Sequence, residues 1–539
     1  MHDYLQGCHM ELHSGPFTAA CHGMTFFQAA EFCYSKLNVV LIGTFSPART
    51  AQNGTQNGPL LCNANVRIEG GCIGIFLARS AIHARRVHWY CQSCHEKLPD
   101  ITQLAPCNCE NGVRVKQLDQ VSYRHLWDHS HQDVNNAVPK YSKTRRQPLG
   151  WEDALMHKIR SDATVEENYS QPSSSPPTNP RHAKFMRKES VHANTQICLD
   201  VSRNFYWCES RPFASVLLDR RMALDYPLSG HIVVLISSHP DDPPMGLRDF
   251  VVPMRSSRIP YDEVKEIVLL GNAEYLHREW PQLRNLPLVT VVDGDPLNRA
   301  DLRAVSIKTA SVCVVLSAWT GKSVDPVLDD KTAVLTTLNV RAMPFDHPEG
   351  MDAHFELPIV TALQHNRNVR LLSEDASSEV EVRESFMMEP FMCGQTVTIS
   401  ALYSLISTSY FTPLAVPVVE HLLYGFQSPV MESYLAEGVG LMGGDEYNPD
   451  ELSPYNIRVR LITVRDGPWT QSHTLNTSTT NLSYGELFVH ALHSSMVCLG
   501  ISRMFQPENA TTAPKRIIIS NPPRQTVLRW DDQVYVLTK

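Results

Sequence analysis

The sequence predicts an α/β protein, in which a parallel sheet covered by helices is joined to smaller α+β lobes. Two observations support this fold class. In the middle of the 539-residue chain, short apolar runs alternate with helical patterns, which is typical of a parallel sheet. A second pattern, one helix followed by several short strands, occurs once near each end of the chain.

The central region predicts a doubly wound, Rossmann-like sheet. Each predicted strand is a short apolar run with many β-branched residues, and helical patterns follow most of them. The predicted strands are residues 231–237, 267–272, 288–296 and 311–318; the predicted helices are 273–283, 298–307 and 329–340; residues 358–372 predict one more helix and strand.

The loop after the first strand has no glycine-rich phosphate cradle. It contains two aspartates, three prolines and a single late glycine, Gly246, whereas dinucleotide sites need several glycines here. Asp293 and Asp295 follow the third strand, where an acid could bind a ribose. We interpret them instead as a turn in which Asp295 caps the helix that starts at Asn298. We therefore expect a rigid platform that is not an enzyme.

The repeated pattern predicts one module used twice. Residues 24–45 and 482–505 each show aromatic and small apolar residues at helical spacing, followed by a short strand. Two further strands, separated by a polar turn, follow each of them in residues 59–78 and 516–538. Because no parallel region precedes the first copy, we expect this chain to be the back part of a longer protein.

The composition indicates a cytosolic protein. The net charge of −8 gives no reason to expect nucleic-acid binding. No apolar run approaches the roughly 20 residues of a membrane helix, and the N-terminus does not resemble a signal peptide. Most of the 14 cysteines should therefore be reduced, and clustered ones are candidate metal ligands.

One such cluster is a CxxCH motif, Cys91, Cys94 and His95, followed a dozen residues later by Cys107 and Cys109. Two close cysteine pairs at this spacing are typical of a zinc site, with His95 as a fifth candidate ligand. A haem or redox-sensing site, and plain thiols in a knuckle-like turn, stay open as alternatives.

Several stretches resemble the slowpoke family of large-conductance, voltage- and calcium-activated potassium channels. The run from GLRDFVVPMRSS to SVCVVLSA (246–318) resembles their second regulator-of-potassium-conductance (RCK) domain. HWYCQSCHEKLPD (88–100) resembles the end of their first RCK domain. MEPFMCGQTVTIS (388–400) and RIIISNPP (516–523) resemble their C-terminal region.

The resemblance implies a division into five parts. They are the C-terminal lobe of a first RCK domain with the cysteine cluster (1–115), a disordered Ser/Pro-rich linker (116–195), the Rossmann-like lobe of the second RCK domain (196–370), a degenerate calcium-bowl loop (371–394) and the C-terminal lobe of the second domain (395–539).

The resemblance also implies a function and an assembly. RCK domains of four subunits form a cytosolic gating ring at the plasma membrane, below a pore and voltage sensor encoded upstream. We expect a homotetramer that couples intracellular calcium or pH to pore opening. The alternatives are a nucleotide-binding oxidoreductase and a soluble assembly subunit without a pore.

The calcium loop departs from the family pattern. The family binds Ca²⁺ through consecutive aspartates, because the ion needs six to eight oxygen ligands. Ala376 and Ser378 align with the two essential carboxylates, and Arg370 aligns with a ligand glutamine. The remaining candidates are weak for calcium: Ser373, Glu374, Asp375, Ser378 and Glu379. The activating signal therefore stays open between calcium and protons.

Overall fold

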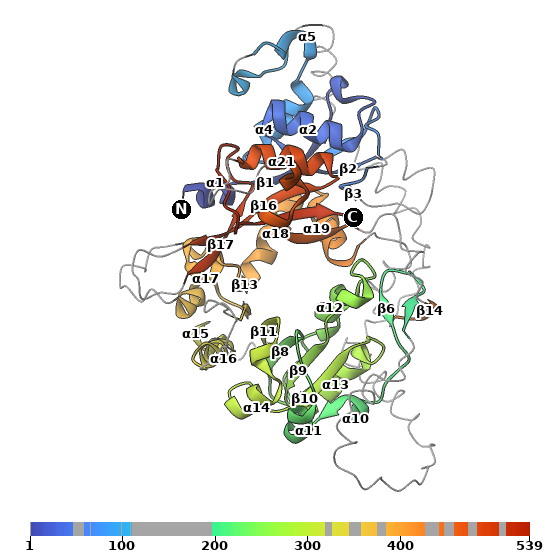
Figure 1. Ribbon diagram of the computed structural model, residues 1–539, viewed down its shortest axis with the longest axis vertical. Coiled ribbons are helices and arrows are strands. Elements are labelled where there is room, and N and C mark those ends of the chain that lie inside the picture. The colour runs from blue at the N-terminus through green and yellow to red at the C-terminus, as the bar shows by residue number, and fades with distance from the viewer. Residues whose placement is uncertain are drawn as a thin grey trace, which may run out of the picture. The chain divides into compact units, whose positions relative to one another are not determined.

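The structure is a computed structural model (Figure 1). The described residues are 2–46, 59–64, 66–98, 100–107, 109, 197–318, 326–343, 357–373, 384–425, 441–446, 457–472, 482–505 and 514–539. All of them belong to a single compact unit, which combines residues 1–115 with residues 188–539. The predicted linker lies outside the described residues. None of the helices in the described ranges has the length and apolarity needed to cross a bilayer.

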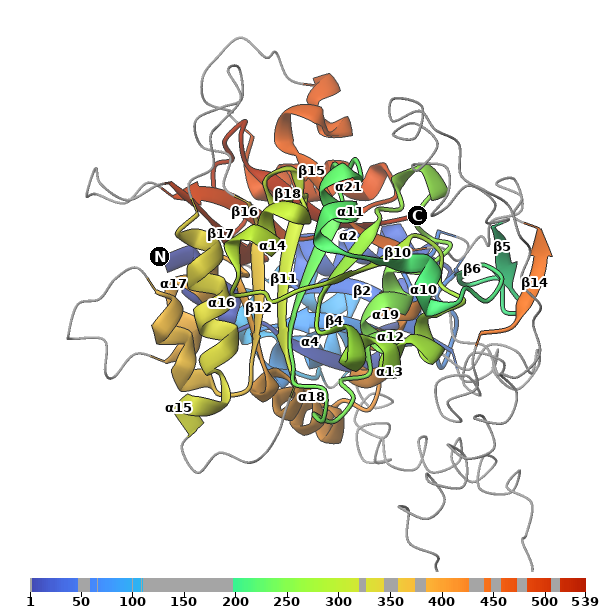
Figure 2. The ribbon, with the colours of Figure 1, turned by 90° about the horizontal axis from the view of Figure 1, so that it is seen from below.

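A seven-stranded parallel sheet forms the centre of the second half (Figure 2). Its strands are β7 (Leu217–Leu218), β8 (Ile232–Ser237), β9 (Ile267–Gly271), β10 (Val289–Asp293), β11 (Val312–Ser317), β12 (Ile359–Leu363) and β13 (Thr396–Thr398). Their order is β13-β12-β11-β8-β9-β10-β7, and every neighbouring pair is parallel. This confirms the predicted doubly wound sheet. The winding reverses between β8 and β11, so the carboxyl ends of these two strands form the topological switch point.

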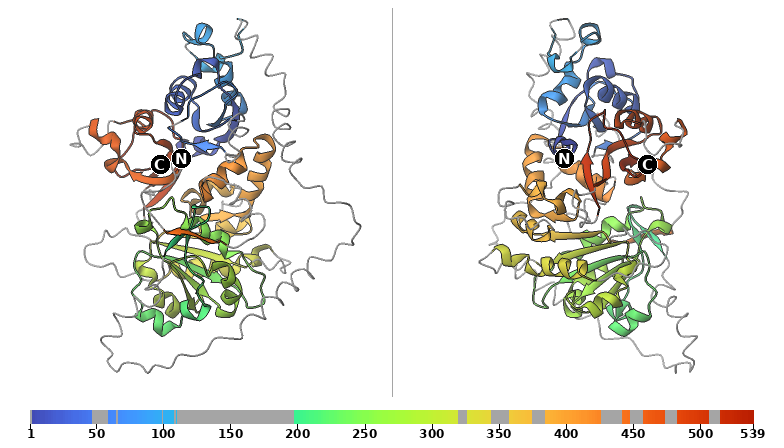
Figure 3. Two further views of the ribbon diagram at one scale, coloured as in Figure 1. Left: turned by 90° about the vertical axis from the view of Figure 1, so that its right-hand side faces the viewer. Right: turned by 60° about the vertical axis from the view of Figure 1, so that its left-hand side comes forward.

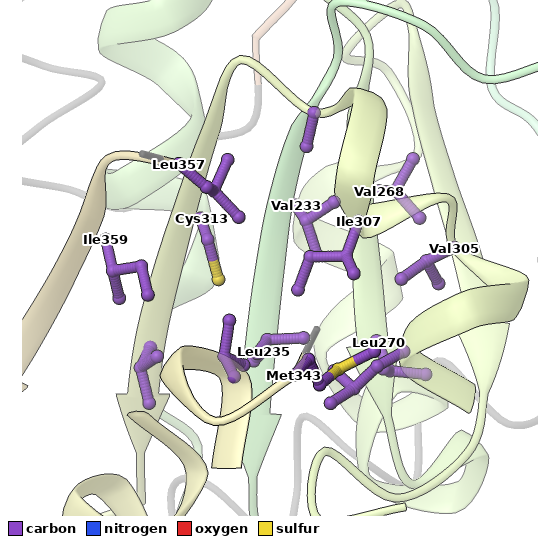
Figure 4. Close-up of a cluster of buried hydrophobic side chains, with 14 of the residues drawn as sticks. Val233, Leu235, Val268, Leu270, Val305, Ile307, Cys313, Met343, Leu357 and Ile359 are labelled. Atoms are coloured by element: carbon purple, nitrogen blue, oxygen red, sulfur yellow. The ribbon is translucent and has the colours of Figure 1, made fainter. Parts of the chain in front are cut away.

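Helices cover both faces of this sheet. Successive strand residues point to opposite faces: Val233 and Leu235 pack under α14 (Arg299–Ala304) and α16 (Lys331–Arg341), in the apolar cluster of Figure 4. Val234 and Ile236 pack against α12 (Leu247–Val251) and α13 (Ala273–Leu283) on the other face. Continuous apolar runs are required because both faces are buried.

The predicted extra helix at 358–372 is wrong. The segment begins with β12 and continues as a 3₁₀ helix, Asn366–Leu372. The buried carboxylate of Asp330 accepts hydrogen bonds from the backbone N–H groups of Gln364 and His365 and from the Asn368 side chain. These bonds fix the turn after β12, and the chain continues from it as a 3₁₀ helix.

The repeated module is confirmed. Its helices, α2 (Phe26–Leu37) and α21 (Tyr484–His493), both start with a capping box, formed by Thr25 with Gln28 and by Ser483 with Glu486. The first sheet has the order β1-β4-β2-β3 and the second has the matching order β15-β18-β16-β17. The strands are β1 (Glu11–Pro16), β2 (Val40–Phe45), β3 (Leu60–Leu61), β4 (Ile73–Ala78), β15 (Arg458–Thr463), β16 (Val497–Phe505), β17 (Lys515–Ser520) and β18 (Gln533–Thr538).

The two modules pack against each other through these equivalent helices (Figure 3, blue and red). The ring of Tyr34 on α2 stacks on the ring of Phe488 on α21, with centroids 3.8 Å apart and planes 18° apart. The guanidinium of Arg524 lies 4.4 Å from the centre of the Tyr34 ring on its other flank. An aromatic stack between buried residues thus joins the first and last parts of the chain.

The remaining elements connect these lobes. A small antiparallel sheet has the order β14-β5-β6; α17 lies between β12 and β13, and α18 and α19 follow β13. The bounds of these strands and helices, and of the other short helices, are α1 (His2–Cys8), α4 (Ala81–Trp89), α5 (Gln92–His95), β5 (Cys198–Asp200), β6 (Tyr206–Trp207), α10 (Phe213–Val216), α11 (Arg220–Asp225), α15 (Pro326–Asp329), α17 (Glu389–Met392), α18 (Ile399–Phe411), α19 (Ala415–Tyr424) and β14 (Gly443–Glu446).

Candidate functional site

The loop between β8 and α12 is where a Rossmann domain would bind phosphate, and a side chain of this protein occupies its amides. The carboxylate of Glu279, from α13, accepts hydrogen bonds from the backbone nitrogens of Met245 (2.6 Å), Gly246 (3.2 Å) and Leu247 (3.3 Å). The hydroxyl of Tyr275 donates to the same carboxylate at 3.2 Å. Gly246 adopts a left-handed conformation, with φ of 74°, directly before α12, which a residue with a Cβ would adopt only at a cost.

This arrangement leaves no cradle for a pyrophosphate. Amides at the start of the first helix bind phosphate in dinucleotide domains because they carry partial positive charge. Here the buried carboxylate of Glu279 supplies the negative charge instead. The side chain of Arg278 also donates hydrogen bonds to the carbonyls of Pro240 and Asp242, which holds the loop against α13. The geometry therefore agrees with a structural platform and offers no support for the oxidoreductase alternative.

The acidic residues after β10 have local structural roles. The Asp293 carboxylate accepts a hydrogen bond from the backbone nitrogen of Ala273, at the start of α13. The predicted cap of the next helix is wrong: Asn298 caps α14 by accepting from Ala300, whereas Asp295 accepts from the backbone of Leu297 within the preceding turn. A capping side chain accepts from amides two or three positions ahead. Asn298 therefore reaches the first turn of α14, whereas Asp295 reaches only Leu297, before the helix begins.

The middle of the predicted calcium loop, residues 374–383, lies outside the described residues. Glu374, Asp375, Ser378 and Glu379 all fall in that part of the chain. Ser373 is described: it is half-buried, and its backbone nitrogen donates a hydrogen bond to the carbonyl of Arg370. The described geometry therefore adds no calcium ligand to those expected from the sequence.

The four predicted cysteines do converge. Cys91 precedes the short helix α5 and Cys94 lies within it. Cys107 and Cys109, further along the chain, lie close to both. All four sulfurs lie within 4.8 Å of one another. Hydrogen bonds of the Cys94 thiol to the other three cysteines, first to Cys109, raise the pKa of Cys94 to about 12. Burial and a contact with Cys109 raise the pKa of Cys107 as well.

His95 does not join this group. Its side chain is buried, and its Nδ1 accepts a hydrogen bond from the backbone nitrogen of Cys91 at 2.9 Å. A neutral imidazole has one acceptor nitrogen and one N–H. Because Nδ1 is the acceptor here, Nε2 carries the proton and has no lone pair for a metal. Of the five predicted ligands, the structure brings together the four cysteines only.

Sequence reasoning missed Glu279, although the sequence contains a signal for it. On the face of α13 that is buried against the sheet, Glu279 lies four residues after Tyr275 and is preceded and followed by apolar core positions. A charged residue at a core position of a helix is almost always paired. Its partners are backbone amides more than thirty residues upstream, which no spacing rule predicts.

Comparison with known proteins decides the family. Three family descriptions match separate parts of the chain. Residues 1–44 match "Calcium-activated BK potassium channel alpha subunit", 227–373 match "Calcium-activated potassium channel slowpoke-like RCK domain", and 415–538 match "Ca2+-activated K+ channel Slowpoke, TrkA_C like domain". The chain belongs to the slowpoke potassium-channel family. The 227–373 match covers strands β8 to β12 of the parallel sheet, and the 415–538 match covers the second module.

Curated relatives show the same relationship over almost the whole chain. The calcium-activated potassium channel slowpoke of Drosophila melanogaster and the calcium-activated potassium channel slo-1 of Caenorhabditis elegans are each 30% identical over 99% of this chain. The matches cover 52% and 50% of those proteins. This slowpoke-family chain thus spans about half the length of the curated relatives it matches.

A solved structure supports the fold. The human SLO3 gating ring matches all of this chain and 68% of its own chain, with a TM-score of 0.62 and 19% sequence identity. At that identity the similarity concerns the fold alone. It agrees with the described architecture of a parallel RCK sheet and smaller antiparallel sheets.

Proposed function

We propose that this chain forms the gating-ring part of a slowpoke-type potassium channel, on the cytosolic face of the plasma membrane. Its role is to convert an intracellular signal into a change of shape that biases a pore formed elsewhere in the subunit. The observation that supports this most is the pair of family matches over the parallel sheet and the second module. No catalytic role is proposed, because the amides of the phosphate loop are bound to Glu279.

The helix α18 supports a role in assembly. None of its thirteen residues is buried, although the helix is strongly apolar. Its large exposed side chains are Leu402 (56% exposed), Tyr403 (67%), Ile406 (57%), Tyr410 (73%) and Phe411 (79%). An apolar patch of this kind on a soluble domain marks an interaction surface. We infer that a neighbouring RCK domain of the ring covers α18, in a homotetramer of the full-length subunit.

The activating signal is proposed to act without a high-affinity calcium site in the 371–394 loop. Arg370 places a cation where the family has a ligand, and Ala376 supplies no oxygen. Calcium could still act through the upstream half of a full-length subunit. Protons are the second candidate signal, because histidine side chains titrate near neutral pH.

The test is a chimera that joins the upstream half of the Drosophila slowpoke channel to this chain. Inside-out patches are recorded while internal calcium and internal pH are varied separately. We expect potassium currents whose half-activation voltage moves with one of the two signals. A chimera that reaches the surface and conducts, but whose half-activation voltage responds to neither signal, would overturn the proposal. The unmodified fly channel is the positive control.

A further inference from the structure

We propose that Cys91, Cys94, Cys107 and Cys109 bind one zinc ion through their four sulfurs, with His95 excluded from the ligand set. The site is independent of the proposed gating function and concerns only the segment that follows the first module. Four thiolates in two close pairs are a frequent ligand set of structural zinc. Thiolates also favour zinc over the hard cations magnesium and calcium.

The sulfur positions fit a tetrahedral ion with little movement. Zinc–sulfur bonds of about 2.3 Å imply sulfur–sulfur separations of about 3.8 Å in a regular tetrahedron. The Cys91 and Cys109 sulfurs are 3.7 Å apart, and all four fall within 4.8 Å. The Cys107 and Cys109 sulfurs are 2.9 Å apart, which is longer than the roughly 2.05 Å of a disulfide. Rotation of one exposed or half-exposed side chain would bring this pair to the tetrahedral distance.

The hydrogen bond of His95 distinguishes this ligand set from haem binding. A CxxCH motif that binds haem would use Nε2 of the histidine, which requires the proton to be on Nδ1. The Cys91 amide points at Nδ1 from 2.9 Å, so a proton there would face another N–H group. His95 is instead a positioning residue: it accepts from the Cys91 backbone and fixes the turn that presents Cys91 and Cys94.

The segment that carries the last two cysteines has little else to hold it. Among its described residues from Glu96 to Cys109, only Leu104 has a buried side chain. The Arg86 side chain donates one hydrogen bond to the carbonyl of Thr102 at 3.2 Å. Just before the cluster, the Thr18 hydroxyl donates to the carbonyl of Tyr90. Segments without enough apolar burial depend on cross-links or metals for order, and a zinc ion would supply such a link.

The first experiment measures metal content in the full 539-residue chain, purified under reducing conditions without added metal. Elemental analysis should give one zinc per chain, and X-ray absorption should show four sulfur neighbours at about 2.3 Å. The variants Cys94→Ser and Cys109→Ser should each lose at least nine-tenths of the zinc. Cys8→Ser, at an exposed cysteine outside the cluster, is the matched control and should keep it. His95→Gln should also keep zinc, because its amide oxygen can accept from Cys91.

Three results of the metal analysis would overturn the proposal. They are an absence of zinc in the parent chain that added Zn²⁺ does not restore, equal zinc content in Cys94→Ser and Cys8→Ser, or a sulfur–nitrogen ligand set that His95→Gln abolishes. Haem absorption at one equivalent per chain, lost in His95→Gln, would likewise contradict it and favour the haem alternative. Cys94 is exposed, so Cys94→Ser should fold, and circular dichroism of each variant checks this.

Limited proteolysis provides a readout that does not depend on metal analysis. Lys97 is exposed and lies between the two cysteine pairs. Removing zinc from the parent chain with a chelator should speed trypsin cleavage after Lys97 at least tenfold, and Zn²⁺ should restore protection. Cleavage after Lys36, which is exposed on α2, serves as the internal reference. Equal rates after Lys97 with and without zinc would mean that the ion does not order this segment.

Discussion

The carboxylate of Glu279 lies 2.6 Å from the backbone nitrogen of Met245, at the place where a Rossmann domain binds phosphate. The same carboxylate also accepts from the next two amides of the loop. A buried charge of this kind is stable only when it is fully hydrogen-bonded. The protein's own carboxylate thus takes the place that a ligand's negative charge has in a dinucleotide domain, and it fixes the loop.

Glu279→Gln tests this structural role. A glutamine keeps one acceptor oxygen but turns an NH₂ group toward the backbone amides, so one or two hydrogen bonds are lost. Hydrogen bonds to a charged group contribute about 1.5–3 kcal/mol each, and we expect the stability of the parallel-sheet lobe to fall by about 2 kcal/mol. Chemical unfolding of the variant and of the parent chain measures the difference.

The matched control is Glu274→Gln, at an exposed position in the first turn of the same helix. This substitution should change stability by less than about 0.5 kcal/mol. If both variants unfold at the same denaturant concentration as the parent chain, Glu279 does not hold the loop. Calorimetry with NAD⁺ should show no binding to the parent chain, and binding at micromolar concentration would contradict the platform interpretation.

Phe488→Ala should weaken the contact between the two modules. The ring of Phe488 is fully buried and stacks on Tyr34, and removal of a buried phenylalanine ring costs about 3 kcal/mol or more. Phe505→Ala, at a half-exposed position of the same module, is the control and should have little effect. Hydrogen exchange of α2 and α21 measures the effect of each substitution. Unchanged protection of α2 in Phe488→Ala would show that the stack does not join the modules.

Arg258→Met should loosen the end of α19. The guanidinium of Arg258 donates hydrogen bonds to the carbonyls of His421, Leu422 and Leu423 and to that of Ile457. Methionine keeps an apolar stem of similar length but leaves these carbonyls without their donor. We expect the amide of Gly425, which donates to His421, to exchange faster by an amount equivalent to about 2 kcal/mol. Arg460→Met, at an exposed position, should leave that rate unchanged.

His421 should make α19 sensitive to acid. Burial, and secondarily the charge of Arg258, lowers the pKa of His421 from 6.5 to about 4. The unfolded state therefore binds a proton more readily than the folded state, and stability falls as pH drops below 6.5. Between pH 7 and pH 5 this group should contribute a loss of about 2 kcal/mol.

Hydrogen exchange of α19 at pH 7 and pH 5, after correction for the intrinsic rate, measures this loss. His421→Leu should remove most of the pH dependence, whereas His277→Gln, at an exposed position of α13, should not. The same pH dependence in the parent chain and in His421→Leu would assign the effect to another group.

Elements with strong local signals were predictable from the sequence. The helix predicted at 273–283 is α13, because Asn272 caps its start and its apolar face has helical spacing. The repeat was predictable because both copies keep the same helix and strand pattern. The edge strands β1 and β15 were not predicted: most of their side chains are exposed or half-exposed, so they lack the alternation that identifies a strand.

The candidate sites were predictable only in part. The spacing of Cys91, Cys94, Cys107 and Cys109 predicted a cluster, and their sulfurs converge. Spacing could not exclude His95, because its exclusion depends on one hydrogen bond to the Cys91 backbone. The role of Glu279 was equally hidden, since its partners come from a distant loop that reaches α13 only in the folded sheet.

The central claim is that this chain passes an internal signal to the gate of a channel. Its most direct test combines the chimeric channel with substitution at the contact between Tyr34 and Phe488. In inside-out patches, the displacement of the half-activation voltage by the effective internal signal is measured in the chimera and in its Phe488→Ala and Phe505→Ala variants. If the modules transmit the signal to the gate, Phe488→Ala should shrink this displacement by half or more without changing potassium selectivity, and Phe505→Ala should retain it. A full displacement in both variants would contradict the account.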